Sequence, residues 1–401
     1  MNGSSSPIQH VVIMIQENQS FDHLFNGYKG ANTQSFGLTH TGATVQLAEQ
    51  HLGAGPNTNH YAMDFLIEYD GGKMDGFDLN TASQLVPYLG AYHYVNPADI
   101  KPYYAMAQQF VLSDDYFTSH IDASFVGHQY LVAAQANHAV NIPSEAWGCD
   151  DSSGNDFVTT LNSDRTVGPV ESPCFTYKTL ADELNAAGLT WHFYAPAITD
   201  PGGEWSALQA SNQIYNGPDW KLDVISPETQ ILTDVSNGIL SNVTWVTPDR
   251  LNSDHPGSES MTGPSWIASV VNAIGQSQFW DSTAIFITWD EWGGEYDHVP
   301  PPYMDYDGDG FRVPLLCISP YAYKGVVNHT QLESASVPRF VENTFGLSTL
   351  AAADARAKPA DSGCTNPSQT VPRAFTPITS EYDRNYFLHV QKRSTLPPDD
   401  D

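Results

Sequence analysis

Short runs of apolar residues recur along this chain, and helix-like patterns lie between them. Each run spans four or five residues, which is typical of a buried strand, and the runs are Val11–Ile15, Trp191–Tyr194, Val243–Val246, Ala284–Thr288 and Leu315–Ile318. The helical patterns end at glycine, a common helix stop, with Tyr177–Ala187 before Gly188 and Trp266–Ile274 before Gly275. Strands that alternate with helices predict an α/β fold with a mostly parallel central sheet and helices on both faces.

Three of these runs lead directly into polar side chains. The segments that follow them are Gln16-Glu17-Asn18, Thr247-Pro248-Asp249 and Trp289-Asp290-Glu291. In open α/β sheets, ligands bind outside the carboxyl ends of the strands. The pattern therefore predicts one site that is built from three distant segments.

The length of 401 residues suits one large α/β domain or two smaller ones. We find no internal repeat, and we predict a single domain over residues 1–395, with loop insertions, and a disordered tail at 396–401. The segment Leu350–Pro372 is rich in Ala, Ser, Pro and Thr, and it is predicted to be a loop.

Acidic residues dominate the charge. The 46 Asp and Glu residues outnumber the 16 Lys and Arg residues, which gives a formal net charge of −30. This charge repels nucleic acid and anionic membranes, and it fits either simple solubility or acidic or salty surroundings. The chain also lacks an apolar run of about 18 residues. We therefore predict no nucleic-acid partner and no stable membrane insertion.

The four cysteines lack the C-x-x-C spacing of a thiolate zinc site. Two disulfides have three possible pairings, and we favour Cys149–Cys174 with Cys317–Cys364 because each would close a loop-like stretch. Four reduced cysteines are the alternative. No signal-peptide pattern follows Met1, but the cysteines and the acidity favour a secreted or periplasmic protein.

Oxygen ligands for a metal ion follow two of the strands. Glu17 and Asn18 come after the first, and Asp290 and Glu291 after the fourth. Adjacent carboxylates repel each other, and a bound cation relieves the repulsion. Oxygen ligands without His or Cys suit a hard divalent ion. The simpler interpretation of Asn18 is a helix cap.

Two Asp-His pairs, Asp254-His255 and Asp297-His298, also come after strands. Histidine can protonate a leaving group or donate to a phosphoryl oxygen, although a single histidine is more often structural. Lys73 lies in a glycine-rich turn and is a candidate phosphate contact, or else an ordinary surface lysine.

The order of these blocks resembles the bacterial phosphoesterase family, which contains phosphatidylcholine-type phospholipases C and secreted respiratory-burst-inhibiting acid phosphatases. The resemblance runs from about residue 8 to 345. The matching blocks are Glu17-Asn18-Gln19-Ser20-Phe21-Asp22-His23, Gly72-Lys73-Met74-Asp75-Gly76-Phe77, Asp290-Glu291 through Asp297-His298-Val299-Pro300-Pro301-Pro302, and Phe311-Arg312-Val313-Pro314 with Ser319-Pro320.

The resemblance implies an alkaline-phosphatase-like α/β core with one divalent metal ion (Ca, Mg, Mn, Zn or Fe). Its implied ligands are Glu17, Asn18, Asp290 and Glu291. Ser124 takes the place of the nucleophile. The positions around the phosphoryl group match His60, Lys73, His255 and His298, with Asp297 beside the last, and His128 and Asp254 are expected to bind substrate. His128 stands where phospholipases usually carry Arg.

These residues together predict an acid phosphatase for small phosphomonoesters. Ser124 would form a phosphoserine, and His298 paired with Asp297 would protonate the leaving oxygen. The main alternative is phospholipase C cleavage of a phosphatidylcholine-like lipid, in which a cage of tyrosines would hold choline; its candidates are Tyr92, Tyr94, Tyr103 and Tyr104. A non-catalytic metal-binding protein would lack some of these residues, and nothing fits the C-x-P-S-R-type motif of a sulfatase.

Overall fold

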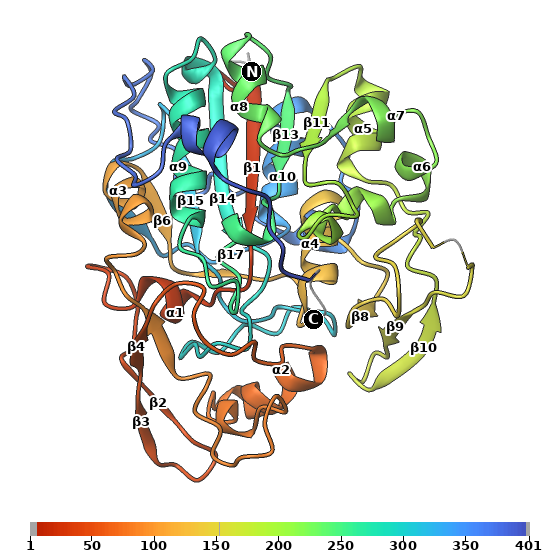
Figure 1. The fold of residues 1–401 in the computed structure, drawn as a ribbon, viewed down its shortest axis with the longest axis vertical. Coiled ribbons are helices and arrows are strands. Elements are labelled where there is room, and N and C mark those ends of the chain that lie inside the picture. Colours follow the sequence, from red (N-terminus) through yellow and green to blue (C-terminus); the bar gives the residue numbers. More distant parts are fainter. Residues whose placement is uncertain (1–5, 152, 398–401) are drawn as a thin grey trace.

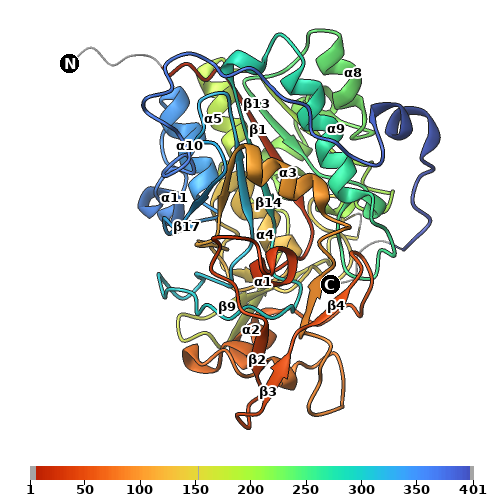
Figure 2. The same ribbon diagram turned by 90° about the vertical axis from the view of Figure 1, so that its left-hand side faces the viewer.

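A computed structural model describes residues 6–151 and 153–397, and it shows one eight-stranded sheet between two layers of helices (Figures 1 and 2). The strands lie in the order β12 (Val224–Ile225), β11 (Trp191–Tyr194), β13 (Val243–Val246), β1 (His10–Gln16), β14 (Thr283–Trp289), β15 (Leu315–Ile318), β6 (Val111–Ser113) and β16 (Val326–Asn328). All of them run parallel except β15, which is antiparallel to both of its neighbours. The predicted mostly parallel α/β sheet is confirmed.

All five apolar runs form strands of this sheet. The first extends by one residue at each end to His10–Gln16, and the fourth likewise to Thr283–Trp289. Every residue of β13, β14 and β15 is buried, which explains why these strands read as continuous apolar runs. The pattern missed β6, β12 and β16, because two or three residues are too few to show a period.

Figure 2 shows helices on both faces of the sheet, as predicted. One face carries α3 (Lys101–Gln109), α8 (Gln230–Ser236) and α9 (Gly263–Gly275), and the other carries α4 (Ser124–Ala133), α5 (Leu180–Ala187) and α10 (Ser336–Phe345). The helix predicted from Tyr177 begins three residues later. Thr179 caps it, and the side chains of Thr179 and Asp182 each bond the other's backbone N–H.

Loops and small sheets gather at the carboxyl ends of β1 and β14 (Figure 1). Their elements are α1 (Phe21–Phe25), α2 (Ala62–Tyr69), β2 (Phe36–Leu38), β3 (Thr44–Gln46), β4 (Ala48–Gln50), β5 (His93–Val95), β8 (Ala139–Val140), β9 (Val158–Leu161) and β10 (Val167–Glu171). The remaining short elements are α6 (Asn212–Tyr215), α7 (Asp219–Leu222), α11 (Ala352–Arg356), β7 (Tyr116–Phe117) and β17 (Leu332–Glu333). This edge of the sheet is therefore thickly covered.

Both favoured disulfides are present, Cys149–Cys174 and Cys317–Cys364. The prediction of a loop over Leu350–Pro372 is wrong in part, because this segment contains α11. The Asp354 carboxylate, in the first turn of α11, accepts hydrogen bonds from the backbone N–H groups of Leu350 and Ala351. Of the predicted tail, residues 398–401 lie outside the described residues. No helix among the described residues has the length and apolar character needed to cross a bilayer.

A buried arginine, Arg312, joins α1 to the loops after β14. The Arg312 guanidinium is fully buried and donates to both carboxylate oxygens of Asp297 at 2.9 and 3.0 Å, and to the carbonyl of Asp114 at 2.7 Å. Asp22 of α1 lies 3.5 Å away and its backbone N–H also donates to Asp297. Such a pair holds its loops in place, because separating the two groups would leave an uncompensated charge in the interior, which is strongly destabilising.

We expect Arg312→Met to lower the free energy of unfolding by about 3–5 kcal/mol, because two buried carboxylates lose their cation. Chemical denaturation followed by circular dichroism measures the change. The matched control is Lys178→Met, which removes a surface cation that pairs with Glu183 and should change stability little. Equal stability of the Arg312 variant and the wild type would contradict the role given to this cluster.

Candidate active site

Ser124 is the first residue of α4, and its position is fixed by the preceding turn. The Asp122 carboxylate accepts hydrogen bonds from the backbone N–H groups of Ala123, at 2.7 Å, and Asn141, at 2.8 Å. The first N–H groups of a helix have no partner within it, and the helix dipole is positive at this end. Ser124 therefore lies where a phosphate group is best received.

Glu17 and Asn18 leave β1 in a sharp turn. The Glu17 N–H donates to the carbonyl of Ser253 at 2.8 Å, and Asn18 has a left-handed backbone with φ 57°, which asparagine tolerates better than most residues. The simpler interpretation of Asn18 as a helix cap is wrong, because Ser20 caps α1 by accepting from the His23 N–H. The Asn18 side chain is thus available to the site.

The side-chain amide of Asn18 lies at the centre of the cluster. Its oxygen accepts from the Ser124 hydroxyl at 3.2 Å, and its nitrogen lies 3.1 Å from His255 Nε2 and 3.4 Å from His60 Nε2. Each histidine has its Nδ1 at 2.6 Å from a backbone carbonyl, that of Thr58 or Pro256. A carbonyl only accepts, so Nδ1 carries the proton, and both histidines turn Nε2 toward Asn18.

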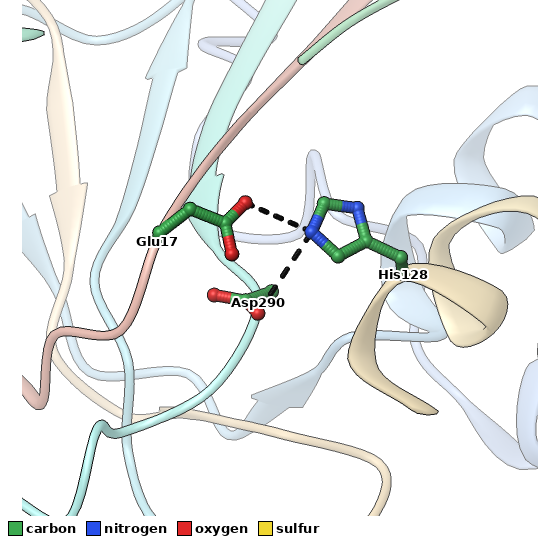
Figure 3. A group of neighbouring side chains, drawn as sticks. All are labelled: Glu17, His128 and Asp290. Carbon is green, nitrogen blue, oxygen red and sulfur yellow. Dashed lines mark hydrogen bonds and ion pairs between the residues drawn. The ribbon is translucent and has the colours of Figure 1, made fainter. Parts of the chain in front are cut away.

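Beside Ser124, two carboxylates and an imidazole form a second part of the cluster (Figure 3). His128 Nε2 lies 2.8 Å from Glu17 Oε1 and 3.8 Å from Asp290 Oδ2. His128 follows Ser124 by four residues, so both lie on one face of α4. Glu17, His128 and Asp290 are buried, and their ligand atoms lie within 4.8 Å of one another, a geometry that could hold a metal ion.

The electrostatics of these carboxylates also suit a cation. Burial, together with the charge of Glu17, raises the pKa of Asp290 to about 8. Its Oδ2 atom accepts no hydrogen bond from the residues that the structure describes. Glu291, the fourth predicted ligand, reaches the cluster through His60, since its Oε1 lies 3.5 Å from His60 Nε2, and its Oε2 accepts from the Gly293 N–H at 2.6 Å. The structure thus brings Glu17, Asn18 and Asp290 to Ser124 and adds His128 to them.

Lys73 does not join this cluster. It lies on the turn after α2 with its side chain 65% exposed, and it donates to Asp70 at 2.5 Å. Its neighbour in the turn is an acid that holds it at the surface, so the structure supports the surface-lysine interpretation. Lys73 has no contact with Ser124 or Asn18 among the described residues.

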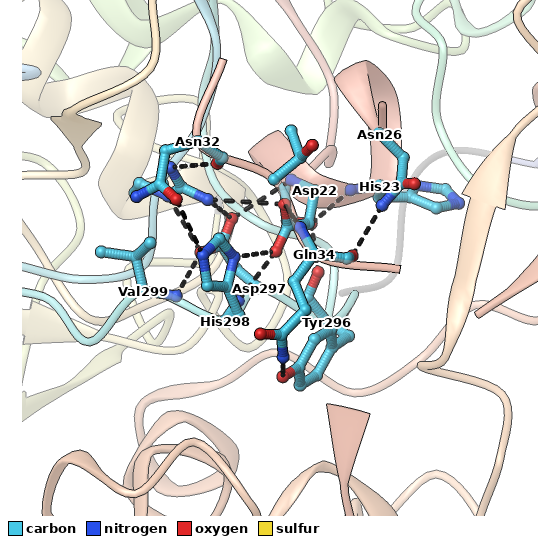
Figure 4. Close-up of polar contacts among 12 residues, drawn as sticks. Asp22, His23, Asn26, Asn32, Gln34, Tyr296, Asp297, His298 and Val299 are labelled. Atoms are coloured by element: carbon cyan, nitrogen blue, oxygen red, sulfur yellow. Dashed lines mark hydrogen bonds and ion pairs between the residues drawn. The ribbon is translucent and has the colours of Figure 1, made fainter. Parts of the chain in front are cut away.

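The predicted pairing of His298 with Asp297 is wrong. His298 Nδ1 lies 2.5 Å from Asp22 and its Nε2 lies 3.1 Å from Asn32 Oδ1, as Figure 4 shows. Arg312 donates to both carboxylate oxygens of Asp297, so that carboxylate is paired with the arginine and not with His298. The contacts of His298 and Asp297 within the described chain belong to this separate cluster rather than to that of Ser124.

Asp254 turns away from the cluster. Its Oδ2 atom accepts from the hydroxyl of Tyr103 at 2.5 Å and from the indole N–H of Trp289 at 3.3 Å. Burial raises the pKa of this carboxyl to about 7. Its backbone is left-handed, with φ 72°, so the next residue, His255, points toward Asn18 instead. Asp254 thus orients the loop, and the structure does not place it as a substrate ligand.

Two residues at the site escaped the sequence analysis. His120 Nε2 lies 3.3 Å from the carbonyl of Asp290, and its Nδ1 accepts from the Asp122 N–H; burial lowers its pKa to about 3. Trp205 stacks on His255 with ring centroids 6.0 Å apart. His120 lies two residues before Asp122, so its closeness to the Ser124 motif could have marked it as a candidate. Nothing in the sequence marks Trp205.

Comparisons with known proteins give several relatives. The model of the Phosphoesterase family matches residues 8–348. The chain is 27% identical to the non-hemolytic phospholipase C of Pseudomonas aeruginosa over 86% of this chain and 55% of that protein. It is 24% identical to phospholipase C A of Mycobacterium tuberculosis over 86% and 74%, and 23% identical to non-specific phospholipase C3 of Arabidopsis thaliana over 94% and 76%.

Among solved structures, a protein in the alkaline phosphatase superfamily from Vibrio parahaemolyticus has a TM-score of 0.39 at 12% identity, over 86% of this chain and 68% of that one. The chain spans about half the length of the Pseudomonas relative. The matched region of the family model contains Ser124 and all of the residues around it. On this match, which covers most of its length, the chain belongs to the Phosphoesterase family.

Proposed function

We propose that this phosphoesterase is an acid phosphatase, which hydrolyses small phosphomonoesters through a phosphoserine at Ser124. One observation carries the proposal. The Ser124 hydroxyl lies at the N-terminus of α4 and bonds to Asn18, and the same amide faces Nε2 of both His60 and His255. A nucleophile, an anion site and two proton carriers therefore meet around one side chain.

The chemistry divides between these groups. Ser124 Oγ attacks phosphorus and passes its proton to the neighbouring Asp290 carboxylate. The bond between phosphorus and the ester oxygen breaks, and a protonated histidine gives its proton to the departing alcohol. His255 and His60 replace His298 in this role, because their Nε2 atoms face Asn18. Water then cleaves the phosphoserine, which releases phosphate and restores Ser124. The N-terminus of α4 stabilises charge on the phosphoryl oxygens throughout.

The residues around Ser124 also fit one divalent metal ion. Glu17, Asn18, Asp290 and His128 would hold it, and the unmatched Asp290 Oδ2 supports this set. When bound, the ion lowers the pKa of the Ser124 hydroxyl and offsets phosphoryl charge. A nitrogen ligand beside oxygen ligands favours Mn, Fe or Zn over Ca.

The second candidate function is a phospholipase C, which the names of the relatives favour. The predicted choline cage receives no support, because its tyrosines have separate partners. Tyr103 donates to Asp254, Tyr104 stacks on Phe25, Tyr92 donates to the carbonyl of Leu38, and Tyr94 donates to Glu49. His128 in place of the usual Arg also favours the monoesterase. The two disulfides support action outside the reducing cytosol.

We expect Ser124→Ala to lower kcat for p-nitrophenyl phosphate by about 10³-fold or more, because the nucleophile is lost. Wild type and variant are assayed side by side on this monoester and on p-nitrophenylphosphorylcholine. The control is Ser236→Ala, an exposed serine at the end of α8, which should keep full activity. Preference for the choline diester would support the phospholipase C, and an active Ser124→Ala variant would refute the nucleophile.

We expect monoesterase activity to be highest at acidic pH, because a protonated imidazole is needed to give a proton to the leaving group and to offset the charge of the phosphoryl oxygens. His255→Asn should lower kcat by about 10²-fold and flatten this pH dependence. His51→Asn serves as control, since that histidine is exposed and pairs with Asp99. An optimum above about pH 8 would contradict the role of protonated histidines.

We expect purified protein to contain one divalent ion per chain and to lose activity after dialysis against a chelator, with recovery when the ion returns. Elemental analysis should show that Glu17→Gln lowers the metal content. Asp22→Asn is the matched control: Asp22 belongs to a second acid–histidine group of similar geometry, but there Arg312 supplies the positive charge. If Asp22→Asn loses the metal and Glu17→Gln keeps it, the metal site would have to be assigned to the group that contains Asp22.

A further inference from the structure

A second pocket lies at the carboxyl edge of the sheet, beyond the strands β11, β12 and β13. Its cavity volume is about 180 Å³. Pro196 follows β11, Glu228 follows β12 and Asp249 follows β13, while Phe387 and Arg393 come from the C-terminal segment. Carboxyl ends of parallel strands are where α/β sheets bind ligands. None of the residues that line this pocket belongs to the cluster around Ser124.

Glu228 is the unusual member of this pocket. Its side chain is almost fully buried, with the residue 5% exposed, and it lines the cavity. Within the described part of the chain, the donor to its carboxylate is its own backbone N–H. Burial, with the nearby charge of Asp249, raises the pKa of Glu228 to about 8. One backbone N–H does not use all the acceptor sites of a carboxylate, so a ligand in the cavity can supply further donors.

The other charges near Glu228 do not satisfy it. Asp249 adds a second acid, whose pKa burial raises to about 6 and whose Oδ1 accepts from the Asn252 N–H at 3.0 Å. Arg393 lowers the pKa of both acids, but its side chain is 72% exposed and pairs with Asp200 at 2.6 Å on the rim. Lys392 is exposed as well. The interior of the pocket is therefore acidic, and its cations lie outside in solvent.

The walls restrict the class of ligand. Phe387 is buried, and Pro196, Pro201 and Pro227 add apolar surface that has no N–H group to offer. An anion would meet two acids. A bare metal ion would need several converging ligands, and the groups in the described chain whose geometry allows this do not include Glu228 or Asp249. A cation that donates hydrogen bonds and carries an apolar body matches both the acids and the walls.

We propose that this pocket binds a small primary alkylammonium ion, whose N–H groups donate to Glu228 and whose carbon chain packs against Phe387 and the prolines. A volume of about 180 Å³ is below the range of drug-sized sites and suits an ion of a few carbon atoms. A quaternary ammonium has the charge but no N–H, so it cannot donate a hydrogen bond to Glu228. This proposal is independent of the activity at Ser124.

The pocket and the candidate active site share one loop. Asp249 caps the short turn Arg250–Asn252, the carbonyl of Asn252 accepts from Gln16 Nε2 at 2.9 Å, and the carbonyl of Ser253 accepts from the Glu17 N–H at 2.8 Å. The side chain of Asn252 exchanges two hydrogen bonds with Gln391, beside the pocket. The loop that carries Asp249 thus also positions the residues that lead into the Ser124 cluster.

Isothermal titration of the full-length protein at about pH 8 tests the proposal with three probes: butylammonium, tetramethylammonium and uncharged butanol. We expect butylammonium to bind at least about 10-fold more tightly than either of the others. Glu228→Gln should weaken butylammonium binding by about 10-fold or more, whereas the exposed Glu381→Gln should not change it. Equal binding of butylammonium and butanol, or unchanged binding in Glu228→Gln, would overturn the proposal.

Arg393→Gln supplies a second test that does not disturb the interior. Because Arg393 is exposed on the rim and offsets the acids, its removal should tighten butylammonium binding by about 3-fold or more. Unchanged or weaker binding in this variant would count against an acidic interior as the recognition element. Thermal melting of Glu228→Gln completes the test, and we expect no loss of stability because a buried charge is removed without breaking a pair.

Discussion

The parallel pairing of β1 with β14 is the constraint on which the rest of the site depends. The two strands stay in register from His10 opposite Thr283 to Gln16 opposite Trp289. The next residues, Glu17 and Asp290, must therefore leave the sheet side by side, and the Asp290 N–H donates to the carbonyl of Gln16 at 3.0 Å. Two carboxylates so close in the interior repel each other. The Asn18 N–H donates to Asp290, His128 lies beside Glu17, and the group has a geometry that could hold a cation.

Helix α4 completes the site because it can approach this turn closely. Gly127 faces the backbone of Asp290, and a Cβ atom there would lie 2.8 Å from the Asp290 carbonyl oxygen. With glycine at this position, Ser124 and His128, one turn apart, both reach the carboxylates. His120 bonds the same carbonyl from the segment that precedes α4. The proposed nucleophile and the candidate metal ligands are thus positioned by backbone contacts as much as by their own side chains.

The sequence predicted the elements of the fold better than the directions of side chains. Apolar runs marked five of the eight strands, and the residues that follow β1 and β14 meet as expected. The pairing of His298 could not be predicted, because adjacency to Asp297 along the chain says nothing of Arg312, which binds Asp297 from another segment. The sequence left two interpretations of Lys73 open, and in the structure its side chain pairs with Asp70, three residues away. The partner of a side chain depends on which residues from distant segments the fold brings next to it. A local sequence pattern holds no information about those residues.

The distribution of positive charge gives the site its chemical character. In a chain with a formal net charge of −30, two arginines are engaged with buried acids elsewhere: Arg312 binds Asp297, and Arg356 binds Glu333 and Asp309. The groups that the structure sets against Asn18 and Glu17 are instead His60, His255 and His128. An arginine stays charged at any ordinary pH, whereas a histidine is charged only when both of its ring nitrogens hold a proton. Under the proposed function, anion binding at Ser124 would therefore depend on the protonation of these histidines.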